Sequence, residues 1–114
     1  MLETYRRFQA GPDPFGRMWD VEFRWLQTGT SIRHADTVDV KFAAGVDGEP
    51  KYEKIIALRH PDLLRLCRDE GRFLTDAWCL KLGALQLKHM IETAEDMDKT
   101  VITVGLDEMR QLNA

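Results

Sequence analysis

Four ionisable residues near the middle of the chain have the types and spacing for acid–base chemistry or metal binding: His34, Asp36, Arg59 and His60. His34 and Asp36 are two positions apart, so on a strand they share one face. The rest of that face is apolar, and an ionisable side chain there is either held by partners or functional. A His–Asp–His group is able to transfer protons or bind a metal ion. The sequence therefore offers His34, Asp36 and His60 as candidate catalytic residues.

A structural role explains the same residues. His34 and Asp36 lie toward the end of a predicted strand, where water reaches the face, and His60 precedes Pro61 at a predicted helix start. No other motif supports catalysis, since GxSxG, HExxH and a cysteine beside a histidine are all missing from the sequence. The structural interpretation carries more weight, and we expect no cofactor and no metal.

Three strands must position these residues. Alternating apolar and polar side chains predict strands over 17–28, 31–44 and 50–59. On the first strand, one face is predicted to carry Trp19, Val21, Phe23 and Trp25.

The second hairpin has a predicted register. A turn with Gly48 in the left-handed conformation sets Phe42 opposite Tyr52 and Lys41 opposite Glu53. The same register brings His60 opposite His34.

A long helix over 75–94 has two apolar stripes instead of the usual one. The first stripe comprises Ala77, Leu80, Ala84, Leu87 and Ile91. The second stripe comprises Trp78, Leu82, Leu85 and His89. Two stripes require two covering layers, and the preceding helix, 61–70, is too short to cover the second stripe alone. We therefore predict a homodimer whose interface is the second stripe.

The predicted fold class is α+β, with a three-stranded antiparallel meander followed by helices and the long helix packed on the sheet. We expect a single domain over 1–114. Its parts are a lead-in arm (1–16, with a helical turn at 3–9), a β-meander (17–59), a helical part (60–99), and a short strand and C-terminal helix (100–114).

Composition limits the partners. The 114 residues are 44% hydrophobic and 31% charged with a net charge of -3, which is typical of a globular protein and not of a nucleic-acid binder. No apolar run is long enough for a membrane span, and the first residues do not resemble a signal peptide. Cys67 and Cys79 are expected in the core, which favours a cytoplasmic protein.

Two functions are compatible with these observations. One is a small, self-associating, non-catalytic module that binds a protein or a small ligand. The other is a small-molecule enzyme with its site around His34, Asp36 and His60.

Overall fold

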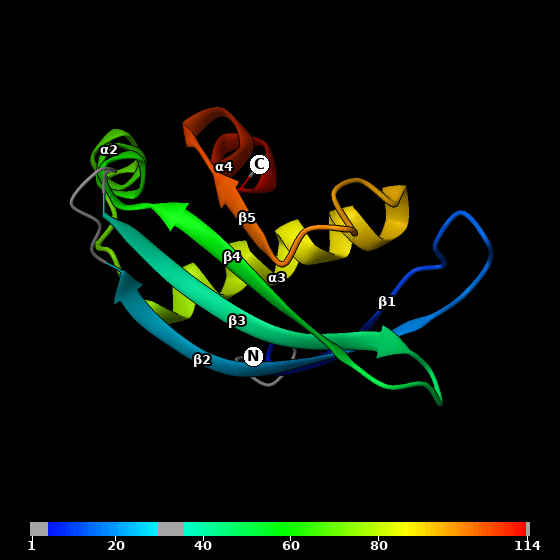
Figure 1. Cartoon of the computed structure of the whole chain (residues 1–114). Helices are drawn as coiled ribbons and strands as arrows, with labels where there is room; N and C mark the ends of the chain where they lie inside the picture. Colours follow the sequence, from blue (N-terminus) through cyan, green and yellow to red (C-terminus); the bar gives the residue numbers. More distant parts are fainter. Residues whose placement is uncertain (1–4, 30–35, 114) are drawn as a thin grey trace.

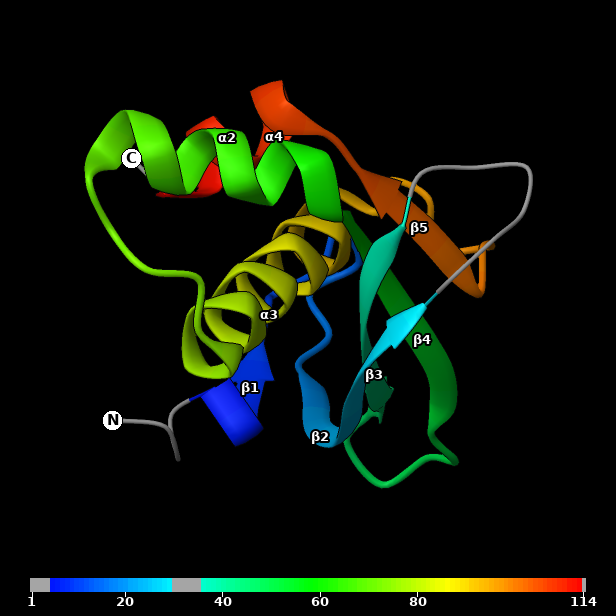
Figure 2. The same cartoon turned by 90° about the vertical axis from the view of Figure 1, so that its left-hand side faces the viewer.

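The computed structural model describes residues 5–29 and 36–113, which form a mixed five-stranded sheet and three helices of the α+β class. The elements in chain order are β1 (Arg7–Ala10), β2 (Trp19–Gly29), β3 (Thr37–Val46), β4 (Tyr52–Arg59), α2 (His60–Glu70), α3 (Asp76–Thr93), β5 (Val101–Val104) and α4 (Leu106–Asn113). The strands lie in the order β1-β2-β3-β4-β5. Neighbours are antiparallel except β4 and β5, which are parallel because α2 and α3 carry the chain back between them. The helices gather on one side of the strands (Figures 1 and 2).

The core lies between β3, β4 and the helices. Alternation along β3 buries Val38, Val40, Phe42 and Ala44. Gly83 of α3 lies against this face, since a Cβ there would be 3.1 Å from Val40 Cβ and 3.3 Å from Phe42 Cε2. Glycine is therefore the residue that permits this close approach of helix and strand.

Helix α3 is buried along its first apolar stripe except at the exposed Ala77, and along the first half of its second stripe. Thr75 caps its first turn by accepting a hydrogen bond from Trp78 N at 3.2 Å, and Ala94 ends it in the left-handed conformation. Trp78 and Leu82 are buried within the single chain, and the Trp78 indole donates to Asn113 Oδ1 of α4 at 3.2 Å. Leu85 is half-buried and His89 is exposed. The first half of the predicted dimer interface is thus already covered by the chain itself.

The lead-in arm is part of the sheet. Residues Arg7–Ala10 form β1 and pair with β2, so that Arg7 is opposite Glu22 and Ala10 is opposite Trp19, whereas residues 7–9 were predicted as part of a helical turn. This prediction is wrong because the polar–apolar alternation of Arg7–Ala10 spans only four residues, too few to identify a strand by itself, and β1 is defined by its pairing with β2.

A β-bulge divides β2. Phe23 is opposite Phe42, but Trp25 is opposite Lys41, so the extra residue Arg24 reverses the alternation. Trp25 therefore lies on the other face from Trp19, Val21 and Phe23, contrary to the prediction. There Lys41 Nζ lies 5.2 Å from the Trp25 ring centroid.

The β3–β4 register is also shifted from the prediction. Tyr52 is opposite Ala44 and Phe42 is opposite Lys54, because β3 continues to Val46 before the turn closes. The shift is two residues, so no side chain changes face. Gly48 has the expected positive φ, and Lys41 still reaches Glu53 as an ion pair, although the two residues are diagonal neighbours.

Candidate functional site

The sheet brings Asp36 and His60 together, but only through the main chain. The His60 N–H donates to the Asp36 carbonyl oxygen at 2.8 Å, at the point where β3 begins and α2 starts. The Asp36 side chain is exposed and the His60 side chain is half-buried. His34 lies outside the described residues, so its proposed place in this cluster is not tested.

No further contact turns this end of the sheet into a catalytic group. The Arg59 guanidinium lies 3.6 Å from the Asp62 carboxylate, one turn along α2. Over residues 5–29 and 36–113, no three histidine, cysteine or acidic side chains are arranged to hold a metal ion. The enzyme hypothesis therefore gains no supporting side-chain contact from the part of the chain that is described.

The two cysteines are buried and free. Burial, together with the smaller effects of the nearby Asp76 and Cys67, raises the pKa of the Cys79 thiol to about 12. Burial also raises the pKa of Cys67. Both side chains therefore remain thiols, which are poor nucleophiles and poor metal ligands.

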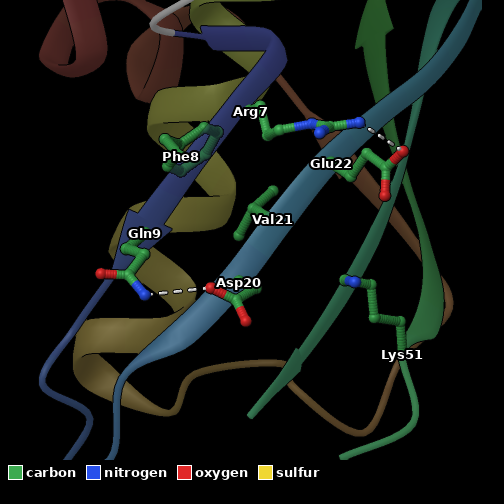
Figure 3. Close-up of a pocket in the computed structure, with 7 residues that line it drawn as sticks. All are labelled: Arg7, Phe8, Gln9, Asp20, Val21, Glu22 and Lys51. Atoms are coloured by element: carbon green, nitrogen blue, oxygen red, sulfur yellow. Dashed lines mark hydrogen bonds and ion pairs between the residues drawn. The ribbon is translucent and has the colours of Figure 1, made fainter. Parts of the chain in front are cut away.

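A hollow of about 360 Å³ lies over β1 and β2 (Figure 3). Its polar side chains project from the same face of the two strands, and Lys51 reaches toward them from the segment before β4. They already pair across the strands, with Arg7 3.4 Å from Glu22 and the Gln9 amide donating to Asp20 at 3.1 Å. These cross-strand pairs hold the short edge strand β1, and a ligand here has to displace them.

The loop between β1 and β2 is organised around one buried carboxylate. The Asp13 side chain is 3% exposed. Its Oδ1 accepts hydrogen bonds from the main-chain N–H groups of Phe15 and Arg17, both at 2.9 Å. Its Oδ2 accepts from Arg17 Nε at 2.8 Å and from the Trp19 indole at 3.0 Å. Burial alone raises the pKa of Asp13, but these hydrogen bonds outweigh it and hold the pKa well below its ordinary value of 3.8.

Hydrogen bonds to Asp13 fix the backbone of this loop, which carries apolar side chains outward. Phe15 is 78% exposed, although its own N–H is fixed to Asp13. The Arg17 guanidinium lies 5.2 Å from the Phe15 ring centroid and 5.9 Å from that of Trp19. The Met18 carbonyl accepts from Asp47 N at 3.2 Å, which ties the loop to the β3–β4 turn. Figure 1 shows the loop and the turn extending at the same end of the sheet.

A second hollow, of about 410 Å³, continues this surface. It is lined by Trp19, Tyr52, Glu53, Lys54, Met97, Asp98 and Thr100. We call the apolar residues of this end, Phe15, Met18, Trp19, Tyr52 and Met97, the distal surface.

Lys54 fixes one wall of the second hollow. Its ammonium is buried and donates to the carbonyl oxygens of Met97 and Lys99, at 2.6 and 2.7 Å. Burial lowers the pKa of Lys54, and the charge of Asp98 partly offsets this effect. The lysine thus holds the connection from α3 to β5 against β4.

The charge around the distal surface is acidic. Asp47, Glu49 and Asp98 form no ion pair with any residue the structure describes, whereas Lys51 is the one unpaired, exposed basic residue between β3 and β4. Sequence reasoning overlooked this end because it treated 11–14 only as a helix terminator. The available signal was the pair of donors, Arg17 and Trp19, that follow Asp13 at four and six residues.

Comparison of the chain with protein-family models, with curated proteins and with solved structures finds no match. Among the described helices, none has both the length and the apolar character that crossing a membrane requires.

Proposed function

We propose that this chain is a small, non-catalytic binding module that docks a partner protein on its distal surface. The observation that carries the proposal is the Asp13 loop. Four hydrogen bonds to a buried carboxylate hold the loop in a conformation that leaves Phe15 and Met18 exposed to water. Apolar side chains of this kind are otherwise expected in a core. A pre-organised aromatic residue loses little entropy on binding, which is typical of an interface anchor.

The charge pattern favours a basic partner segment. Tyr52 is 66% exposed beside the hollow of the distal surface, and three unpaired carboxylates lie at this end against one unpaired lysine, Lys51. A segment with one apolar anchor and flanking lysine or arginine side chains satisfies both features, through burial of the anchor and through charge complementarity.

The rest of the chain serves as the scaffold in this proposal. Helix α3 lies against the sheet at Gly83, and the Trp78 indole of its second stripe donates to Asn113 of α4, so the strands that carry the distal surface are held from one side. We also infer a cytoplasmic location, which the two free, buried cysteines support.

The experiment is a selection of random displayed peptides on the full chain, followed by calorimetry of the strongest synthetic peptide. We expect basic peptides with an aromatic or aliphatic anchor, and a Kd that rises by roughly tenfold or more in Tyr52→Ala and in Phe15→Ala. Phe73→Ala is the matched control, since Phe73 is 91% exposed and belongs to the connection between α2 and α3. Figure 1 shows this connection at the end of the molecule opposite the β1–β2 loop.

Two results contradict the proposal. One is a selected peptide whose Kd is unchanged in Tyr52→Ala and Phe15→Ala. The other is a peptide whose binding is weakened equally by Phe73→Ala. The peptide then binds exposed apolar side chains in general and not the distal surface.

A further inference from the structure

Strand β2 has an open edge over more than half of its length. On one side β3 pairs with it as far as Gly29. On the other side β1 reaches only Glu22, so residues 23–29 face no strand in the part of the chain that is described. The N–H and C=O groups that point away from β3 along this edge are available to another strand.

An apolar groove of about 330 Å³ runs beside this edge, between β2 and the start of α3. Phe23 and Leu26 of β2 and Ala77 and Leu80 of α3 contribute its apolar lining. Phe23 and Leu26 are only partly buried. A strand added to β2 therefore gains hydrogen bonds along its backbone and an apolar contact for its side chains.

From this edge and groove, we infer that a second copy of the chain occupies the site, with the two β2 strands paired antiparallel about a two-fold axis. A two-fold interface must be complementary to itself. Arg24 is the only charged residue in 23–29, and antiparallel pairing places its two copies toward opposite ends of the paired segment.

The rim of the groove is complementary in charge as well. It carries Arg6 and Asp76, of opposite sign, and neither forms an ion pair among the described residues. In the inferred pair, we expect Arg6 of one copy to meet Asp76 of the other across the two-fold axis.

This surface replaces the predicted one as the basis for a homodimer. Trp78 and Leu82 are buried within one chain and are not free to contact a partner. The other edge of the sheet, β5, has four residues, so the β2 edge is the longer open edge of the described sheet. Antiparallel pairing also directs the two distal surfaces away from each other, because β2 begins at the distal end. The dimer then carries two partner sites, a consequence that rests on the proposed function, whereas the pairing itself does not.

Sedimentation equilibrium of the full chain tests the pairing. We expect a mass of twice 13.2 kDa at micromolar concentration. Gln27→Lys adds a charge at the open edge, and Ala77→Glu adds a carboxylate to the groove; both residues are exposed, so the fold is expected to survive. Each change should raise the dimer Kd by roughly tenfold or more. Gln111→Lys is the matched control, on the exposed side of α4, and should leave the Kd unchanged.

Three outcomes overturn the inference. The first is a 13.2 kDa monomer at every concentration tested. The second is a dimer whose Kd is the same in Gln27→Lys, Ala77→Glu and Gln111→Lys. The third is a monomer in which only a selected peptide protects the amides of 23–29 from hydrogen exchange, which assigns the edge to another protein. Tyr52→Ala separates the two proposals, because it should weaken peptide binding and leave the dimer intact.

Discussion

The two ends of the sheet use ionisable side chains in opposite ways. At the distal end, the Asp13 carboxylate is buried, accepts four hydrogen bonds and leaves an aromatic side chain exposed. At the other end, the exposed Asp36 meets His60 through main-chain atoms alone. The first arrangement depends on the chemical identity of the side chain, and the second does not. In this chain, the number of hydrogen bonds that a polar side chain makes is thus a better guide to a functional surface than the presence of residue types that are common in catalytic sites.

The largest effect is expected for Asp13→Asn, which keeps the shape but removes the charge. At neutral pH the melting temperature should fall by roughly 5 °C or more, as measured by circular dichroism. The pKa of Asp13 is lowered in the folded chain and ordinary, near 3.8, after unfolding, so its stabilisation is present above that pH and is lost as the pH falls below it. The difference between the two proteins should therefore shrink below pH 3.8. A difference that grows in acid contradicts this account of Asp13.

Lys54→Met should have the next largest effect at the same end. Methionine fills a similar volume but leaves the carbonyl oxygens of Met97 and Lys99 without their donor. The free energy of unfolding should fall by roughly 1–3 kcal/mol, measured by urea denaturation. Lys51→Met is the control, because Lys51 is exposed. Equal losses in both variants mean that burial of Lys54 contributes nothing.

Gly48→Val sharpens the comparison at the distal turn. Gly48 has φ +82° and open space around the position of a Cβ, so the cost is backbone strain without a clash. We expect a loss of about 1–2 kcal/mol. Gly48→Asn should cost less, since asparagine tolerates positive φ. If valine and asparagine cost the same, the turn changes conformation to accept them.

The smallest effect is expected at the other end. Asp36→Ala and His60→Ala keep the main-chain hydrogen bond between these residues, so each should change stability by no more than about 0.5 kcal/mol. Titration with zinc, followed by calorimetry, should show no heat that either substitution abolishes. A zinc signal that disappears in both variants restores the enzyme hypothesis and breaks the comparison between the two ends.

Most elements of the fold could be predicted from local patterns. The strand over 101–104, the helix ended by Gly71 and the long helix capped by Thr75 all occur as expected, because periodicity and caps are properties of neighbouring residues. Strand β1 and the bulge at Arg24 could not be predicted, because both depend on pairing with a strand elsewhere in the chain.

The candidate site was harder to predict than the fold. Asp13 lies between two prolines, a context that indicates a turn and hides the four donors that converge on its carboxylate. His34 and Asp36 drew attention because they interrupt an apolar strand, yet β3 begins only at Thr37, so Asp36 lies outside the buried face. His34 lies outside the described residues, so the site around His34, Asp36 and His60 stays a prediction.

The Lys54 ammonium has a consequence for the order of folding. The carbonyl groups that accept its hydrogen bonds lie 43 and 45 residues further along the chain. The hairpins of β2, β3 and β4 form from contacts that are closer in sequence. They are therefore expected to form first, because closing a shorter loop costs less entropy. Lys54 cannot be buried at low cost until β5 and its preceding loop arrive, so the hollow beneath Trp19 and Tyr52 is completed late. Refolding followed at these two aromatic side chains should accordingly lag behind formation of the meander.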